Sequence, residues 1–281
     1  MSLTTTETLQ RISKTLTNII NFQSRQAGIR YDEERKSQER GQNERARIQQ
    51  TRKANHIRQG FISEWMQQIH TEMFDFECSD EEVNYVTRPR DAVQIHTATA
   101  NALGPDRCTT FIDAFACVGG DTLAAMYKFR DAEIFTVQKC TTSGERARCD
   151  RLEQNIATFK KMFPNRMNGI HPVSVAKIDI RSFLTEFHAD ISVLHLDPPW
   201  TMDRQITIEE FLETEVWTPL RANKIYPLII VLKLPHPVTN IDEWPRLEIQ
   251  YQMMDCVRPR GPHGYAVHIL RRVDKPALPG R

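Results

Sequence analysis

Seven short apolar runs follow one another between residue 108 and the carboxyl terminus, and amphipathic stretches separate most of them. A run of about four to eight apolar residues bounded by turn residues is typical of a buried strand, whereas a longer amphipathic stretch is typical of a helix. The pattern predicts strands at residues 110–115, 134–137, 173–178, 191–196, 228–234, 247–253 and 265–270.

The connections between these strands predict how the sheet is built. Helical stretches separate the first five strands, which requires right-handed crossovers and parallel neighbours. The last two strands follow each other without a convincing helix, which predicts an antiparallel hairpin at the sheet edge. Residues 108–281 are therefore predicted to form an α/β domain with a seven-stranded, doubly wound, Rossmann-like sheet, in the variant found in methyltransferases.

Two segments precede this domain. Residues 1–60 hold 12 Lys or Arg against 6 Asp or Glu, and residues 23–59 are mostly Gln, Arg, Glu and Lys. This composition favours a basic, polar helical arm, which is either a solvated helix or a surface for nucleic acid or a partner protein. Within residues 61–107, helical spacing over 61–73 and a helix over about 89–103 indicate a helical extension that packs on the core.

Composition excludes several classes of protein. The net charge is +1, and the six cysteines include no C-x-x-C pair and no His at metal-ligand spacing, so neither a zinc site nor a disulfide framework is indicated. The amino terminus lacks the apolar core of a secretory signal, and the longest apolar run, residues 227–234, is too short to cross a bilayer. We expect a soluble intracellular protein, cytoplasmic or nuclear, without a metal or membrane attachment.

The first of two chemical motifs is FIDAFACVGGDT, residues 111–122, in which a predicted strand runs into a glycine turn and a helix. Gly119 and Gly120 let the backbone approach a ligand closely, at the edge where doubly wound sheets bind ligands. The carboxylate of Asp113 suits a cationic ligand such as a sulfonium that carries an amino group. The motif lacks the signatures of P-loops and dinucleotide sites, and an ordinary glycine turn is the alternative.

The second motif is Asp197-Pro198-Pro199-Trp200, directly after the fourth predicted strand. Consecutive prolines hold the backbone extended, so their carbonyls can be fixed toward a ligand. An exocyclic base amine is a poor nucleophile because its lone pair is delocalised into the ring. Hydrogen bonds from this amine to the Asp197 side chain and the Pro198 carbonyl would orient the lone pair and stabilise the charge that develops on nitrogen. Trp200 supplies a flat face for the base, unless it is a core residue after a simple turn.

At these motifs the chain resembles the trimethylguanosine synthases, which methylate the exocyclic amine of the 7-methylguanosine RNA cap. Those enzymes carry an aromatic-Ser-Val-Thr-Pro stretch, then Asp-Ala-Phe-x-Gly-Val-Gly-Gly-Asn-Thr, then Ser-Pro-Pro-Trp, and the resemblance covers about residues 80–270. It implies S-adenosylmethionine as cofactor and Asp197, Pro198 and Trp200 as catalytic residues. The implied cofactor-binding residues are Asp113, Phe115, Gly119, Gly120, Thr122, Gln138 and Asp179.

Several positions depart from the family pattern or carry a second reading. Cys117 replaces a Gly and Asp121 an Asn, changes that the turn can absorb. Asp197 replaces a Ser, a form typical of adenine N6-methyltransferases. Gln138 ends the second strand where the family has an acidic residue for the ribose hydroxyls, so hydrogen bonding is kept but the charge is missing. Asp179 matches the acidic position near the adenine amine, or caps the helix that follows it.

A cationic 7-methylguanine gains from lying between two aromatic faces. Trp200 is one candidate face and Trp65 or Tyr85 the other, although the helical spacing also suits Trp65 as a core residue. Lys233 and His236, at the end of the fifth strand, could meet cap phosphates or extend to solvent. The loop before the last strand holds a basic cluster that could contact the RNA backbone or remain solvated: Arg258, Arg260 and His263.

These observations leave three hypotheses. The leading one is methylation of N2 of the 7-methylguanosine cap, with S-adenosylmethionine as cofactor and capped RNA as partner. Asp197 motivates the second, an adenine N6-methyltransferase on DNA or RNA. Gln138 and the basic arm motivate the third, a catalytically degenerate subunit that keeps the fold for a structural or RNA-binding role.

Overall fold

The computed structural model describes residues 76–79, 81–82, 85–163, 172–199, 206–238, 241–258 and 264–273, together with Arg52. The predicted arm over residues 1–60, apart from Arg52, and the predicted helix over residues 61–73 lie outside the described residues. None of the helices within the described ranges is both long and apolar enough to span a bilayer.

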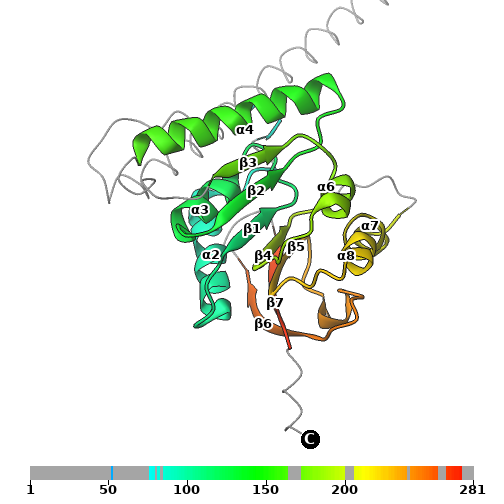
Figure 1. Cartoon of the computed structure of the whole chain (residues 1–281). Helices are drawn as coiled ribbons and strands as arrows, with labels where there is room; N and C mark the ends of the chain where they lie inside the picture. Colours follow the sequence, from blue (N-terminus) through cyan, green and yellow to red (C-terminus); the bar gives the residue numbers. More distant parts are fainter. Residues whose placement is uncertain are drawn as a thin grey trace, which may run out of the picture. The chain divides into compact units, whose positions relative to one another are not determined.

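Within the described residues, seven strands form one mixed sheet in the order β3-β2-β1-β4-β5-β7-β6 (Figure 1). The parallel strands are β1 (Thr110–Asp113), β2 (Glu133–Val137), β3 (Val173–Ala176), β4 (Val193–Leu196) and β5 (Ile229–Leu234). Strand β7 (Ala266–Arg272) runs antiparallel both to β5 and to β6 (Tyr251–Val257). The predicted α/β class, the seven strands and the antiparallel hairpin at the edge are confirmed.

Helices cover both faces of this sheet (Figure 1). On one face lie α2 (Pro89–Leu103), α3 (Gly120–Lys128) and α4 (Ser143–Met162). On the other face lie α6 (Ile180–Glu186), α7 (Ile208–Leu212) and α8 (Thr218–Asn223), with a π-helical stretch, η2 (Glu213–Trp217), between α7 and α8. A short 3-10 helix, η3 (Ile241–Glu243), precedes β6.

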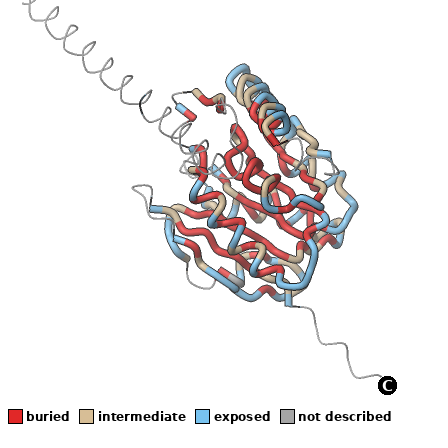
Figure 2. Tube along the Cα trace, turned by 90° about the vertical axis from the view of Figure 1, so that its left-hand side faces the viewer, coloured by how far each residue is buried: buried red, intermediate tan, exposed pale blue. Residues whose placement is uncertain are grey.

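Two hydrophobic layers hold the sheet between these helices. Successive residues of a strand point to opposite faces. In β5, Ile229 and Val231 pack in the layer of α2, α3 and α4, whereas Ile230 and Leu232 pack in the layer of α6, α7 and α8. Figure 2 shows buried positions along the central strands. Because both faces are covered, these strands are apolar at nearly every position rather than at alternate ones.

Local signals set the ends of α2 and α4, the two longest helices within the described residues. Pro89 occupies the first turn of α2, and Gly104 follows its last residue with φ 62°, donating its N–H to the carbonyls of Ala100 and Asn101. These ends confirm the helix predicted over residues 89–103. Helix α4 begins with a capping box, in which the Thr142 side chain accepts from Glu145 N and the Glu145 side chain accepts from Thr142 N.

The prediction for the sixth strand was wrong in its position. The apolar pattern placed the strand at residues 247–253, whereas β6 begins at Tyr251 and ends at Val257. Pro245 has no N–H to offer a ladder, and Leu247 packs against the core instead of pairing. The four residues after Tyr251 are exposed, because β6 is an edge strand with a register shift between Met253 and Asp255. Such a strand leaves no regular hydrophobic signal.

The two glycines between β1 and α3 serve different purposes. Gly119 has φ 99°, a left-handed conformation that residues with a Cβ rarely adopt. A Cβ on Gly120 would lie 2.9 Å from both the Thr87 carbonyl oxygen and Val86 Cγ2. The second glycine is therefore required by the close packing of the start of α3 against residues 86–87.

This packing predicts a specific loss of stability in Gly120→Ala. We expect the free energy of unfolding to fall by about 1 to 3 kcal/mol, because the backbone that the new methyl group meets cannot move aside. Gly144→Ala is the matched control: a Cβ added to Gly144, in α4, would meet no neighbouring atom within 4 Å, so the same substitution should raise stability by about 0.5 to 1 kcal/mol. Urea unfolding measures both, and equal effects of the two substitutions would contradict this account.

Candidate active site

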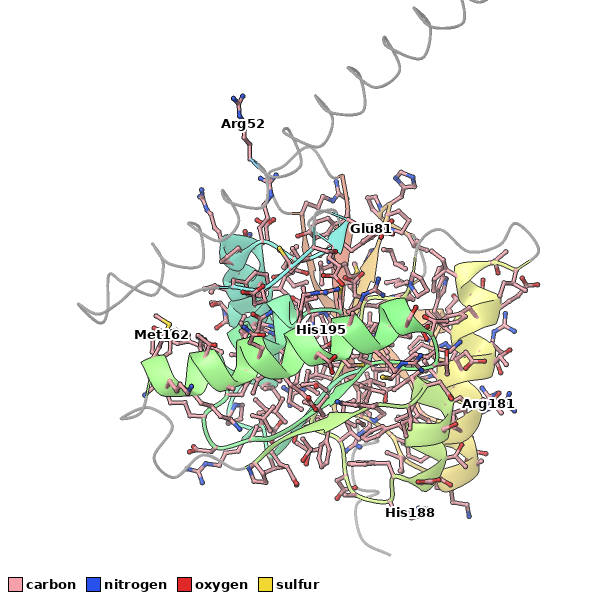
Figure 3. All side chains as sticks on the ribbon, turned by 90° about the horizontal axis from the view of Figure 1, so that it is seen from above. Arg52, Glu81, Met162, Arg181, His188 and His195 are labelled. Carbon is pink, nitrogen blue, oxygen red and sulfur yellow. The ribbon has the colours of Figure 1, made fainter. Side chains whose placement is uncertain are left out.

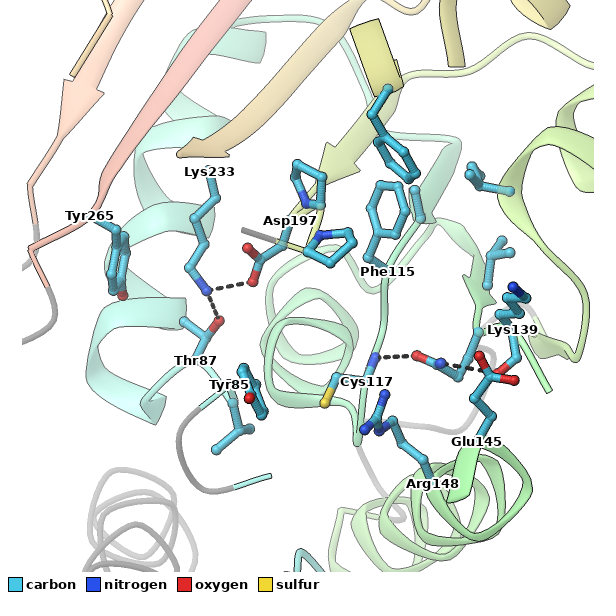
Figure 4. Close-up of a pocket in the computed structure, with 18 of the residues that line it drawn as sticks. Tyr85, Thr87, Phe115, Cys117, Lys139, Glu145, Arg148, Asp197, Lys233 and Tyr265 are labelled. Atoms are coloured by element: carbon cyan, nitrogen blue, oxygen red, sulfur yellow. Dashed lines mark hydrogen bonds and ion pairs between the residues drawn. The ribbon is translucent and has the colours of Figure 1, made fainter. Parts of the chain in front are cut away.

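A cavity of about 750 Å³ lies at the carboxyl ends of the parallel strands (Figure 4). The segments that follow β1 to β4 all contribute to its lining, and so do Lys233, near the end of β5, residues 85–88 and Asp91. Doubly wound sheets bind their ligands at this edge. The predicted site residues that line the cavity are Tyr85, Phe115, Gln138, Asp179, Asp197, Pro198 and Lys233.

A hydrogen-bonded ion pair lies in one half of the cavity, with Asp197 toward the other half (Figure 4). Lys233 Nζ donates to Asp197 Oδ2 at 2.6 Å and to Thr87 Oγ1 at 2.8 Å. Thr87 Oγ1 in turn donates to Asp121 Oδ2. The side chain of Lys233 is 3% exposed and that of Asp197 is 18% exposed. A continuous polar chain therefore runs from Asp197, at the cavity, into the core.

The charges of this pair support each other. Burial disfavours the charge of Lys233, but the carboxylates of Asp197 and Asp121 outweigh burial and raise the pKa of the ammonium. Burial raises the pKa of the Asp197 carboxyl, and the positive charge of Lys233 opposes this rise. The Tyr265 ring centroid lies 4.7 Å from Lys233 Nζ, a cation–π contact, and the Tyr265 hydroxyl donates to Asp91 Oδ2 at 3.2 Å.

This position of Lys233 differs from both sequence-based expectations. Its ammonium neither reaches outward for a phosphate nor extends into solvent, because it is buried against Asp197 and Thr87. The hydrogen bond from Lys233 holds the Asp197 side chain in one orientation. His236 and Arg258, two other basic residues proposed from the sequence, are exposed and are not among the described residues that line the cavity.

The other half of the cavity is built around the turn after β1 (Figure 4). Cys117 N donates to Gln138 Oε1 at 2.9 Å, and Gln138 Nε2 donates to Lys139 O at 3.1 Å. Cys117 has φ 52°, so it keeps the left-handed conformation at the position where the resembling enzymes have Gly. Burial raises the pKa of its thiol to about 12, which keeps the thiol protonated. Gln138 thus fixes this turn as well as lining the cavity.

The remaining predicted residues of the first motif support the site from behind it. Asp113 is 2% exposed, and its carboxylate accepts from Thr122 Oγ1 at 2.6 Å. Burial raises the pKa of Asp113 to about 6. None of Asp113, Gly119, Gly120 and Thr122 is among the described residues that line the cavity. The sequence predicted that the Asp113 carboxylate meets a cationic ligand, whereas in the structure this carboxylate faces the first turn of α3.

Asp179 caps a helix and also lines the cavity. Its side chain caps α6 by accepting from Ser182 N at 2.8 Å and from Ser182 Oγ at 3.0 Å, and these bonds lower its pKa. It also lines the cavity, next to Ile180. Tyr85, at the rim, is 53% exposed. Trp65, Trp200, Arg260 and His263 lie outside the described residues.

Several lining residues were not singled out from the sequence, among them Thr87, Asp91, Arg148, Phe211 and Tyr265. Thr87 and Asp91 flank Pro89, so the sequence alone indicated only that they lie at the start of a helix. Tyr265 directly precedes β7, and its position depends on the antiparallel pairing of β7 with β5. The predicted strand order alone could have located Tyr265, because a residue at the start of a strand that pairs with β5 antiparallel lies beside the end of β5, where Lys233 is.

An ion pair holds the segment that leads to the cavity rim. Glu82, 2% exposed, accepts from Arg151 at 2.8 and 2.5 Å and from Arg148 Nε at 3.3 Å. Ser79 N donates to the same carboxylate at 2.8 Å. Burial alone would raise the pKa of Glu82, but the hydrogen bonds of Arg151 and Ser79 outweigh burial and lower it. Ser79 and Glu82 are thereby tied to α4.

Comparison with solved structures gives distant likenesses. A putative methyltransferase of Escherichia coli is 19% identical with a TM-score of 0.42, over 64% of this chain and 85% of the other. A putative methylase of Haemophilus influenzae is 14% identical with a TM-score of 0.43, over 66% and 99%. An rRNA methylase of Streptococcus thermophilus is 10% identical with a TM-score of 0.41, over 64% and 95%. At such values these likenesses concern the fold and say nothing about a substrate.

No protein-family model matches the chain, and no curated protein sequence matches it.

The Glu82 ion pair predicts a pH-dependent stability. Because folding lowers the pKa of Glu82 below its ordinary value of 4.5, its contribution is present above that value and is lost as pH falls through the lowered pKa. We expect Glu82→Gln to reduce the free energy of unfolding by about 2 kcal/mol at neutral pH. The difference from the wild type should shrink below about pH 4. Glu186→Gln, at an exposed position, is the control, and a Glu82→Gln effect that is independent of pH would contradict the assignment.

Proposed function

We propose that the chain is an S-adenosylmethionine-dependent methyltransferase that methylates an exocyclic amine of a nucleobase, namely N2 of the 7-methylguanosine RNA cap. The observation that carries the proposal is the position of Asp197 and Pro198. They follow the central strand β4, at the junction of the two halves of a 750 Å³ cavity. Active sites of this kind combine a large pocket with a carboxylate of shifted pKa.

The half of the cavity around Phe115 suits the cofactor. Phe115 and Ile180 offer apolar surface for an adenine ring, and Asp179 offers carboxylate oxygens that can accept from the adenine amine. Gln138 offers an amide for the ribose hydroxyls at the end of β2. These residues fit S-adenosylmethionine, although Gln138 lacks the negative charge that an acidic residue would supply at this position. When bound, S-adenosylmethionine supplies an electrophilic methyl group.

Asp197 acts on the nucleophile. Its carboxylate accepts a hydrogen bond from the base amine, which orients the nitrogen lone pair and stabilises positive charge on that nitrogen. Lys233 donates to Asp197 Oδ2, so one oxygen is fixed and the other, Oδ1, can accept from the substrate. The ammonium also favours the ionised form of this carboxyl, in which both oxygens accept hydrogen bonds. The proton of the methylated amine leaves through Asp197 toward water.

The walls of the other half favour a cationic base. Tyr85 presents an exposed ring at the rim, and the carboxyl side chains of Glu81, Asp91 and Glu215 also line the cavity. A 7-methylguanine carries a positive charge and gains both from an aromatic face and from nearby carboxylates. Arg88 also lines the cavity, and its cationic guanidinium group suits the cap phosphates.

A second candidate is an adenine N6-methyltransferase. It is favoured by Asp197 itself, since a carboxylate before Pro-Pro accepts equally well from the N6 amine of adenine. Adenine is neutral, so it would gain less from the acidic rim, and for this reason we rank it second. Gln138 motivates the remaining alternative, a fold that has lost transfer activity.

The methyl-transfer assay that separates these functions uses labelled S-adenosylmethionine with 7-methylguanosine cap analogue, capped RNA, and uncapped RNA and DNA that contain adenine. We expect transfer to the cap, and a loss of roughly 100-fold or more in Asp197→Ala, because the acceptor of the amine hydrogen bond is gone. Asp197→Asn should lose less, because it keeps an acceptor oxygen and loses only the negative charge. Asp190→Ala, at an exposed position, should keep wild-type activity. Transfer to adenine alone would select the second candidate, and no transfer to any substrate would select the degenerate fold.

The ion pair predicts a shifted pH profile in Lys233→Met. Without the ammonium, the pKa of the buried Asp197 carboxyl rises further, so the ionised form appears only at higher pH. The acidic limb of the kcat/KM profile should therefore move to higher pH by about 1 pH unit or more. Lys128→Met, at an exposed position of α3, should leave the limb in place. A Lys233→Met enzyme with reduced activity but an unmoved acidic limb would show that Lys233 does not act through Asp197.

A further inference from the structure

Three ligand-type side chains lie together in the core behind the cavity. His96 comes from α2, Asp121 from α3 and His195 from β4, and one ligand atom of each lies within 4.8 Å of the other two. His96 and His195 are fully buried, and Asp121 is 7% exposed. Figure 3 shows His195 in the interior of the molecule. None of the three residues is among the described residues that line the cavity, and only Asp121 is linked to it, through its hydrogen bond from Thr87. We call these residues the His96–Asp121–His195 cluster.

The polar atoms of the cluster are largely unpaired. His96 Nδ1, Asp121 Oδ1, His195 Nδ1 and His195 Nε2 have no hydrogen-bond partner among the described residues. A buried polar atom left unsatisfied costs about 1 to 3 kcal/mol. Four such atoms on three side chains that lie together are unusual for a core, because buried polar groups are nearly always paired. Their concentration in one place indicates a ligand.

The hydrogen-bonding capacity of the cluster favours a cation over water. His96 Nε2 lies 3.0 Å from the Asp121 carbonyl oxygen, so it carries the proton and Nδ1 keeps a lone pair. Asp121 Oδ2 accepts from Thr87, which leaves Oδ1 as an acceptor. A neutral His195 adds one further lone pair. One water has two protons for these three acceptors, whereas a metal ion can accept all three lone pairs.

The second contact of His96 matches the usual surroundings of a metal-binding histidine. Metal-ligating imidazoles commonly donate their other N–H to a backbone carbonyl or carboxylate, which fixes the tautomer and the ring. The His96 Nε2 to Asp121 O contact is of this kind. The rings of His96 and His195 lie edge to face, with centroids 5.4 Å apart. A divalent ion here would also balance the buried carboxylate of Asp121, since buried charges are generally paired or coordinate metals.

We propose that His96, Asp121 and His195 form a binding site for a divalent transition metal, with zinc as the best-matched ion. Two imidazoles and a carboxylate are common zinc ligands. Ligand atoms around a tetrahedral zinc, with bonds of about 2.0 to 2.2 Å, are about 3.4 Å apart. The cluster must therefore contract by about 1.5 Å at most, within the reach of side-chain rotation. The ion fastens α2, α3 and β4 to one another behind Asp197.

Metal content of the full chain tests this site directly. After equilibration with zinc and removal of unbound metal, we expect about one zinc per wild-type chain. His96→Gln and His195→Gln should each lower this content ten-fold or more. His188→Gln is the matched control, because His188 is exposed at the periphery, after α6 (Figure 3), and should keep the metal. Loss of zinc from the control as well, or less than one-tenth of a zinc in the wild type, would overturn the proposal.

The six cysteines offer other zinc ligands, so the donor atoms are identified separately. Cobalt(II) replaces zinc and gives intense near-ultraviolet bands only when thiolates bind it. We expect visible cobalt bands without thiolate bands, whereas thiolate bands would overturn the assignment. If the histidine variants fail to fold, the wild type still decides: its thermal midpoint should rise in zinc relative to chelator, and an unchanged midpoint counts against the site. Methyl transfer is not measured, so the outcome is independent of the proposed function.

Discussion

The ion pair between Lys233 and Asp197 is the interaction on which the organisation of the site depends. Two side chains of opposite charge, from the ends of the neighbouring strands β4 and β5, meet at 2.6 Å in a largely buried place. Removing one partner from such a pair leaves an uncompensated buried charge, which is strongly destabilising. Thr87 and Asp121 extend the pair to the segment before α2 and to α3. The sheet edge, both helices and the Asp197 carboxylate are thereby positioned together.

The same edge divides the cavity by chemistry. On one side, Phe115, Gln138 and Asp179 follow β1, β2 and β3 and offer apolar surface with neutral and acidic acceptors. On the other side, Tyr85 and Tyr265 stand near carboxylates and the Lys233 ammonium. Asp197 and Pro198 lie where the two sides meet. A donor molecule and an acceptor base can therefore approach each other at one carboxylate, which is what transfer between two bound molecules requires.

Much of the fold could be predicted because its signals are local. Continuous apolar runs gave the parallel strands, which are buried on both faces, and Pro89 with Gly104 fixed the ends of α2. The edge strand β6 was misplaced because its middle residues face solvent and its register shifts. The motif after β4 indicated a carboxylate of the cavity lining for a related reason, because it directly follows a recognisable central strand.

The parts of the site that could not be predicted depend on tertiary contacts. Lys233 read as a basic residue at the ligand edge, but only the fold brings Thr87 and Asp197 to its ammonium. Asp113 read as a ligand-binding carboxylate, whereas the start of α3 turns Thr122 toward it. The cysteine spacing gave no reason to expect a metal, and the proposed metal ligands come from residues 96, 121 and 195, whose spacing resembles no short motif.

The central claim is that the cavity binds a methyl donor beside Asp197. A crystal structure of the full chain with S-adenosylhomocysteine tests it most directly. The account predicts the adenine near Phe115, Ile180 and Asp179, the ribose at Gln138, and the sulfur facing Asp197 and Pro198. An adenosyl group bound elsewhere, or a cavity that stays free of it at saturating ligand, would contradict the account.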